Sequence, residues 1–510
     1  MFRKIFVCAT AAIIAAGTSS AQLSRSDIAE GPGDNLFTLL NGVNNAAVEN
    51  RLLDDWKYVK GRFLGQYGGS NGDRFARWID EATDSNGDPV VINGTEYRWR
   101  YTIAHTGHAM TAAVQLNDKT VFDGLFREAR KFMQKSPADL PAGDSSFADL
   151  YIATAYTQNQ TSPNAVTTTP AGGVGTFGVG GTHHMVNPLV LAGYRWGNSG
   201  NINYHVEARK IFSAWRRNEA PSVRDPLFIR GVRDEECKAG YSNYGACWRM
   251  PMKLREGHIQ NEISSHPYYH PEHYDIWASL YSVGSNNNNY WCDAADESRR
   301  ALFDVFTNSD SGFIPNKMDW DGTEYQFGIN QTQFINQFGE PKIDRDDELA
   351  RRDGRSPNKD DRTYGADPTR YPFTLAVDRL FNGQAGGQAI AVRIMRRYYR
   401  DAIRTPGVPG ITRNEFTWDG SRVASRNNST NLATSVMLGV AIHAADGHPW
   451  LTQERKRDVL RDIWTIDLES EQVRSPYQGA VYMVGMLVAS GKYDNFMTNN
   501  EMSRTCSGQN

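Results

Sequence analysis

Residues 196–209 read Trp-Gly-Asn-Ser-Gly-Asn-Ile-Asn-Tyr-His-Val-Glu-Ala-Arg and join two segments in which apolar residues recur every three or four positions. This spacing places apolar side chains on one face of an α-helix. The glycines and asparagines at the start of the stretch favour a tight connection over a continued helix. The stretch therefore predicts a helix over 185–196, a turn, and a second helix over 202–216.

The same spacing recurs along most of the chain and predicts about twelve helices. They span residues 101–116, 119–134, 145–157, 185–196, 202–216, 268–283, 293–308, 371–384, 387–404, 430–446, 452–464 and 476–490. No linker rich in Pro, Ser or Gly divides the chain, and no repeat of solenoid length is present. We therefore expect an all-α fold with six inner and six outer helices, the (α/α)6 toroid. Its long connections, such as 158–182 and 309–368, are where binding residues are expected.

The first 21 residues have the order of a secretory signal peptide. Arg3 and Lys4 precede the apolar stretch Ile5–Ala16, and small residues follow up to Ala21. The apolar stretch is shorter than the ~20 residues that span a bilayer. We expect cleavage near Ala21-Gln22 and export to the periplasm or the medium, with no membrane association afterwards.

A small β-hairpin is predicted near the N-terminus. Val90–Ile92 and Thr95–Trp99 flank Asn93-Gly94, a pair that favours a type I′ turn. We therefore divide the mature chain into an N-terminal extension, residues 22–98, that carries the hairpin and packs on a main helical domain, residues 99–510.

Charge and cysteine content limit the partners of the protein. The net charge is −3 for the full sequence, and about −5 after the signal peptide is removed. So weak and dispersed a charge argues against nucleic-acid or membrane partners, and we expect a monomer without a cofactor. The remaining cysteines are Cys237, Cys247, Cys292 and Cys506. Their spacing is not that of a zinc site, and Cys237–Cys247, which closes a short loop, is the favoured disulfide.

Five segments, taken in chain order, resemble the family 8 glycoside hydrolases, which include cellulases, xylanases and chitosanases. The segments are 103–110 (IAHTGHAM) followed by 122–125 (FDGL), 196–209 (WGNSGNINYHVEAR), 267–278 (PYYHPEHYDIWA), 312–315 (GFIP) with Asp319, and 367–372 (DPTRYP). The final predicted helix also fits. The resemblance implies an (α/α)6 toroid that acts on a β-linked glycan such as cellulose, xylan or chitosan.

The chain departs from this family at the catalytic carboxylates. Inverting hydrolysis uses a carboxylic acid and a carboxylate base ~6.5–9.5 Å apart. The resemblance places the acid of the family at Ala104, its central Asp cluster near Gly181–His184, and its base at Ser265 or His266.

Histidines are concentrated in the segments that the resemblance assigns to the cleft. Seven of the 11 histidines lie there: His105, His108, His183, His184, His266, His270 and His273. A neutral imidazole can act as an acid or a base near neutral pH. The alternative for any one of them is a packed or hydrogen-bonded structural histidine.

Four functions fit this pattern. The first is a hydrolase with relocated carboxylates, for which Glu262 and Asp149 are the leading candidates. The second is a polysaccharide lyase, in which His, Tyr, Asn and Arg side chains act on a uronate polymer. The third is a metal site formed by His105 and His108, three residues apart on one helix face, with His183 or His184. The fourth is a glycan-binding protein without turnover.

We rank the hydrolase first and the lyase second. The candidate catalytic residues are Glu262, Asp149, His105, His184 and His266. The candidate substrate-binding residues are His108, His183, Tyr268, Trp320, Asp319, Asp367 and Arg370. For Asp367 the alternative is a helix N-cap, with Arg370 as a surface residue. The expected partner is a polysaccharide or oligosaccharide.

Overall fold

The computed structural model describes residues 23–69, 73–83, 87–136, 148–152, 154–162, 166–167, 179–217, 228–230, 249–251, 262–265, 270–307, 317–320, 325–327, 363–364, 370–401, 416–417, 432–469, 473 and 475–509. The predicted signal peptide and the predicted Cys237–Cys247 disulfide lie outside these residues. Among the described helices, none is long and apolar enough to cross a membrane.

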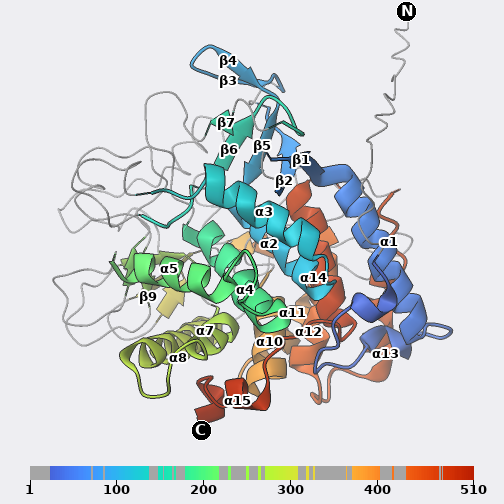
Figure 1. The fold of residues 1–510 in the computed structure, drawn as a ribbon. Coiled ribbons are helices and arrows are strands. Elements are labelled where there is room, and N and C mark those ends of the chain that lie inside the picture. The colour runs from blue at the N-terminus through green and yellow to red at the C-terminus, as the bar shows by residue number, and fades with distance from the viewer. Residues whose placement is uncertain are drawn as a thin grey trace, which may run out of the picture.

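Helices make up most of the described structure (Figure 1). They are α1 (Asn45–Phe63), α2 (Ile103–Gln115), α3 (Lys119–Phe132), α4 (Val179–Trp196), α5 (Tyr204–Arg217), α7 (Pro271–Ala278), α8 (Asn286–Thr307), α10 (Tyr371–Asn382), α11 (Gln388–Asp401), α12 (Leu432–Ala445), α13 (Gln453–Trp464), α14 (Pro476–Ala489) and α15 (Asn499–Met502). Short 3-10 helices cover Arg25–Asp27, Leu36–Leu39 and Ser507–Gln509. The helix-rich fold expected from the sequence is confirmed.

Six helices follow one another in a closed ring of contacts. Helix α2 packs on α4, α4 on α7, α7 on α10, α10 on α12, α12 on α14, and α14 returns to α2. A second helix lies against each member: α3 on α2, α5 on α4, α8 on α7, α11 on α10, α13 on α12 and α1 on α14. The ring therefore has an inner and an outer layer.

Apolar patterning explains which helices are inner. In α14, the eleven residues from Gly479 to Ala489, together with Pro476, are all buried, so the helix is apolar on every side. A helix of this kind is stable only when other elements surround it. Outer helix α3 instead buries one face, including Phe122, Leu125 and Phe126, and exposes Lys119 and Arg130.

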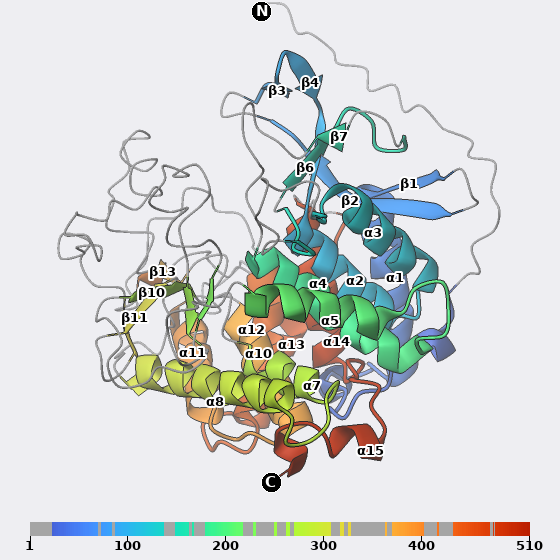
Figure 2. The same ribbon diagram turned by 60° about the vertical axis from the view of Figure 1, so that its left-hand side comes forward.

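The structure contains more β-structure than the expected all-α class. One antiparallel sheet has the order β1-β2-β5-β6-β7, with β1 (Leu64–Gly68), β2 (Arg74–Glu81), β5 (Trp99–Thr102), β6 (Thr154–Thr157) and β7 (Val166–Thr167). A second sheet, in which β9 and β10 are parallel and the other pairs antiparallel, has the order β12-β11-β10-β9-β8, with β8 (Phe228–Arg230), β9 (Arg249–Pro251), β10 (Glu262–Ser265), β11 (Lys317–Trp320) and β12 (Tyr325–Phe327). Figure 2 shows the first sheet above α2 and the second near α11. Strands β13 (Thr363–Tyr364) and β14 (Phe416–Thr417) form a separate pair.

Two sequence predictions about local structure have opposite outcomes. The hairpin is present: β3 (Val90–Ile92) pairs with β4 (Thr95–Tyr97) across Asn93-Gly94, and both turn residues have positive φ, 50° and 77°. The helix expected over 145–157 is wrong, because Thr154–Thr157 forms strand β6 on the edge of β5. Side chains on β6 alternate between half-buried and buried, as on a strand that covers a core with one face.

A disulfide joins Cys292 of α8 to Cys506, 214 residues later, with the two Cα atoms 5.3 Å apart. The next residue, Ser507, donates from its backbone N and its hydroxyl to the buried Asp275 carboxylate, at 3.1 and 2.6 Å. The C-terminal segment is therefore fastened to inner helix α7 and to its outer neighbour α8.

Candidate active site

A small buried cavity lies where α2, α4, α7 and α10 approach one another. Its volume is about 30 Å³, room for one or two water molecules. It is lined by His108, Thr111, His184, Asn187, His270, His273, Arg370, Phe373, Met437, Val481, Val484 and Tyr493. The four helices belong to the sequence segments whose resemblance to glycoside hydrolases had assigned them to a cleft, so the structure brings these distant segments together.

A glycine sets the spacing of the two helices that carry most of these residues. A Cβ atom on Gly107 of α2 would lie 2.4 Å from the backbone carbonyl of His184 on α4. Only a residue without a side chain permits this approach. The close contact therefore determines how far His183 and His184 stand from His105 and His108.

The variant Gly107→Ala is expected to lose about 1–3 kcal/mol of stability, because α4 must move to admit the methyl group. Urea unfolding followed by circular dichroism measures the change. Gly61→Ala is the matched control: Gly61 is exposed in α1 with open space around it, and alanine there is expected to stabilise the helix by about 1 kcal/mol. Equal stability of Gly107→Ala and wild type would contradict the close contact.

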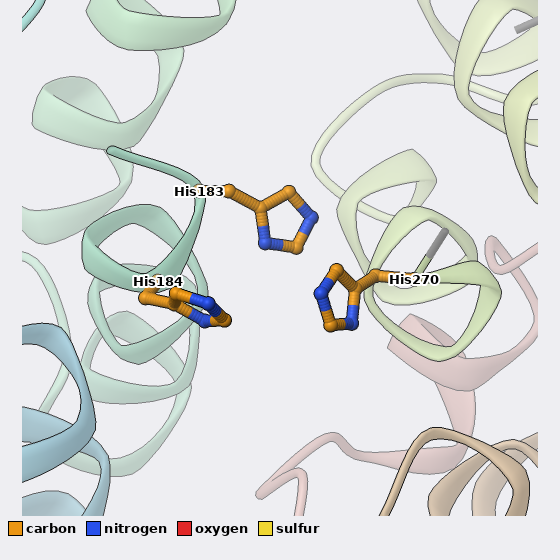
Figure 3. Close-up of side chains that lie close together, drawn as sticks. All are labelled: His183, His184 and His270. Carbon is orange, nitrogen blue, oxygen red and sulfur yellow. The ribbon is translucent and has the colours of Figure 1, made fainter. Parts of the chain in front are cut away.

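Histidines from α4 and from the start of α7 form a compact buried group. The ring centroids of His183 and His270 are 4.4 Å apart, and those of His270 and His273 are 5.0 Å apart. His184 lies beside His183 in the chain and 4.3 Å from His108 between ring centroids. Figure 3 shows the imidazoles of His183, His184 and His270 directed into one shared space.

Two hydrogen-bonded pairs orient this group. Arg370 donates from Nη1 to Nε2 of His184 at 2.6 Å, and the same nitrogen lies 3.5 Å from Nε2 of His108. On the other side, Nδ1 of His270 lies 3.0 Å from Oε1 of the fully buried Glu272. Thr374 on α10 also donates to Oε1 of Glu272, at 3.3 Å.

Burial keeps the imidazoles neutral. It lowers the pKa of His108, His183 and His184 well below the usual value, and nearby positive groups such as Arg370 add to the effect. Burial also lowers the pKa of His105 to about 4 and that of His273 to about 3. The same loss of solvation raises the pKa of Glu272 to about 7. Each neutral ring retains one lone pair that can accept a proton or bind a metal.

Among the described residues, two groups have the geometry to hold a metal ion. They are His183, His184 and His270, and His270, Glu272 and His273, with candidate ligand atoms within 4.8 Å of one another in each group. The group expected from the sequence, His105 and His108 with His183 or His184, is not one of them. Ring contacts instead place His105 and His108 beside Tyr477, at 5.5 and 5.9 Å.

Of the other predicted site residues, some lie at the cavity, some lie elsewhere, and some are outside the described residues. His108, His184 and Arg370 line the cavity, and His183 contacts the ring of His184. The backbone of Glu262 on β10 pairs with that of Trp320 on β11, and Ile263 pairs with Asp319. Asp149 donates its backbone N–H to Lys135 after the end of α3 and does not line the cavity. His266, Tyr268 and Asp367 lie outside the described residues.

Sequence reasoning overlooked one central residue. Glu272 lies in the run His270-Pro271-Glu272-His273, where two histidines and a glutamate fall within four positions. That spacing is typical of residues that share a site, and it was the signal that could have identified Glu272.

Sequence comparisons give no relatives, since no family model and no curated protein matches the chain. Structural comparison gives clear ones. A cold-adapted family 8 xylanase in complex with substrate is 16% identical, with a TM-score of 0.62 over 93% of this chain and 99% of that one. Rex8A from Paenibacillus barcinonensis complexed with xylose is 18% identical, with a TM-score of 0.59 over 91% and 98%.

A third structure agrees with these two. The family 8 xylobiose complex from Teredinibacter turnerae is 17% identical, with a TM-score of 0.59 over 91% of this chain and 98% of that one. The similarity extends over almost the full length of all three proteins, as the five sequence segments had indicated. The chain therefore has the fold of the family 8 glycoside hydrolases.

Proposed function

We propose that the protein is an exported enzyme that hydrolyses a β-linked glycan, and that its ring of paired helices is an (α/α)6 toroid. The observation that carries the proposal is the meeting of α2, α4 and the start of α10 at the hydrogen-bonded group of Arg370, His184 and His108. Support for the substrate class comes from the fold, which the chain shares with xylanases bound to xylose and xylobiose. Support for export comes from the signal-peptide pattern of the first 21 residues.

The side chains that surround the cavity offer polar groups that match a sugar, and the cavity itself, at about 30 Å³, holds water rather than a pyranose ring. Arg370 offers guanidinium N–H donors, and neutral imidazoles offer one donor and one acceptor each, which matches sugar hydroxyl groups. The ring of Tyr477 lies 6.0 Å from the Arg370 guanidinium and 5.9 Å from the His108 ring, where it can stack on a pyranose. We assign the acid–base work to Glu262 and to the imidazoles of His105 and His184.

A lyase is the second candidate, and the Arg370–His184 hydrogen bond favours it. A guanidinium can neutralise the carboxylate of a uronic acid, and a neutral imidazole can remove the proton at C5. The electrons of that C–H bond then form the C4–C5 double bond as the glycosidic oxygen at C4 departs with a proton. The product is an unsaturated uronate that absorbs ultraviolet light, whereas hydrolysis gives saturated ends.

The test is incubation of the mature protein with cellulose, xylan, chitosan and a polyuronate, with two readouts. New reducing ends on one of the neutral or amino-sugar polymers, without ultraviolet absorbance, are the expected result. Absorbance with the polyuronate would assign elimination and overturn hydrolysis. Binding to a glycan without any product would overturn the enzymatic proposal and leave a binding protein.

A further inference from the structure

Four histidines and one glutamate form a buried cluster that the proposed glycan chemistry does not use as a whole. His183 and His184 come from α4, and His270, Glu272 and His273 come from the start of α7. Each is less than a tenth exposed. Imidazoles are polar, so burying five titratable side chains together costs free energy that something in the protein must offset.

One histidine of the cluster lacks hydrogen-bond partners among the described residues. His273 is 4% exposed, and neither of its ring nitrogens has a hydrogen-bond partner among the described residues. Its Nε2 lies 3.6 Å from Oε1 of Glu272, beyond ordinary hydrogen-bond length. A buried donor or acceptor without a partner is unfavourable. A cation bound within the cluster would give imidazole lone pairs that are shielded from water a role as ligands.

We propose that this cluster binds one divalent transition-metal ion through His183, His184 and His270. Three imidazoles with an open fourth position are a ligand set that zinc accepts, and copper, nickel and cobalt accept it too. Zinc–nitrogen bonds of ~2.0–2.1 Å hold tetrahedral ligands about 3.4 Å apart. The three candidate nitrogens already lie within 4.8 Å of one another, so small side-chain rotations complete the site.

The surroundings of the three ligands fit a metal site. Nδ1 of His270 faces Oε1 of Glu272 at 3.0 Å, and when Nδ1 donates to the ionised carboxylate, the other nitrogen, Nε2, carries the lone pair. A carboxylate that accepts from a ligand imidazole in this way is the common outer partner of metal-bound histidine. His184 and His270 both line the cavity of about 30 Å³, which has room for a water molecule on the fourth coordination position.

Metal binding through Nε2 of His184 requires Arg370 to release that nitrogen. Its guanidinium donates to Nε2 of His184 at 2.6 Å, so a metal ion that uses this nitrogen replaces that hydrogen bond. Arg370 lines the same cavity and can then turn its N–H groups toward a bound anion or sugar. Both proposals use His184, but their tests are separate, because metal content is measured without substrate.

The experiment uses the purified mature protein, stripped of metal by a chelator and titrated with Co²⁺ while its visible absorption is recorded. One equivalent per chain, with the d–d bands of nitrogen-coordinated tetrahedral cobalt, is expected, and Zn²⁺ should displace it. His183→Ala and His270→Ala are each expected to lose at least about 100-fold in affinity, and Glu272→Gln about 10- to 100-fold.

Two further variants make the assignment specific. His443→Ala is the matched control, since His443 is also buried but lies in α12 with Nε2 bonded to the backbone oxygen of Val488 at 3.0 Å. It is expected to bind a full equivalent. His273→Ala is expected to retain binding as well; loss there with retention in His183→Ala would overturn the ligand set in favour of His270, Glu272 and His273.

Wild-type protein that binds no cobalt or zinc in a saturable manner would overturn the proposal outright. Where an alanine variant does not fold by circular dichroism, the wild type still provides the answer. Electron paramagnetic resonance of its Cu²⁺ complex resolves nitrogen couplings from coordinated imidazoles, and a spectrum without them overturns the assignment.

Discussion

Arg370→Ala is expected to lower kcat for glycan cleavage about 100- to 1000-fold, the usual cost of one well-placed donor to a developing charge. Arg370 is the one charged side chain other than histidine among the residues that line the described cavity. It is only 8% exposed and donates to Nε2 of His184. Its removal leaves the cavity without a fixed positive charge, and the effect should fall on kcat more than on protein stability.

Two further variants test whether the loss of activity is specific to the guanidinium of Arg370. Arg370→Lys should recover only part of the activity, because an ammonium group lacks the planar pair of donors. Arg379→Ala is the control on the same helix: Arg379 donates to the backbone oxygen of Ala444 at 2.9 Å and does not line the cavity. It should leave kcat unchanged. Wild-type turnover by Arg370→Ala, measured as reducing ends per minute, would remove Arg370 from the proposed machinery.

Glu128→Ala is expected to destabilise the protein by about 3–5 kcal/mol, because it leaves a buried positive charge without its partner. Glu128 on α3 and Arg77 on β2 form an ion pair with side chains 1% and 0% exposed. Tyr101 donates to Glu128 at 2.9 Å, and Arg77 donates to the backbone oxygens of Asn159 and Ser162 at 2.7 and 2.8 Å. The pair thus joins an outer helix, the first sheet and the segment after β6.

Urea unfolding of matched variants measures this cost. Glu96→Ala is the control, since Glu96 pairs with Arg98 at 3.0 Å on the surface, and it should change stability by at most about 1 kcal/mol. The double replacement Arg77→Met with Glu128→Leu should regain much of the loss, because it removes both buried charges. A Glu128→Ala midpoint equal to that of Glu96→Ala would show that the buried pair does not stabilise the fold.

Sequence patterns predicted the helices well where a residue that starts or ends a helix lies next to it in the chain. The predicted helix 371–384 corresponds to α10, Tyr371–Asn382, which ends at Gly383 with φ +67°. Residues 145–157 carry similar apolar spacing, but Thr154–Thr157 forms strand β6, because β5 offers an edge for pairing. Helix α1 escaped prediction altogether. Its residues are largely polar, and it is held by packing on α14.

The residues of the candidate site were likewise predicted only in part from the sequence. The sequence placed His105 and His108 on one helix face and singled out His183, His184 and Arg370, and the structure groups these residues near one cavity. Glu272 was passed over, because an acidic residue is by default expected on the surface. In the fold it is fully buried between two histidines.

The amino-acid sequence by itself determined the helix-rich fold and the segments that meet at the site, since apolar spacing, glycine positions and short motifs act within a few residues. Only the tertiary structure decided that α1 completes the outer layer, that β6 is a strand, and that His183, His184, His270 and Glu272 share one buried point. Those features depend on contacts between residues far apart in the chain, such as Thr102 and Thr154, and on the loss of water around side chains, which no local pattern encodes.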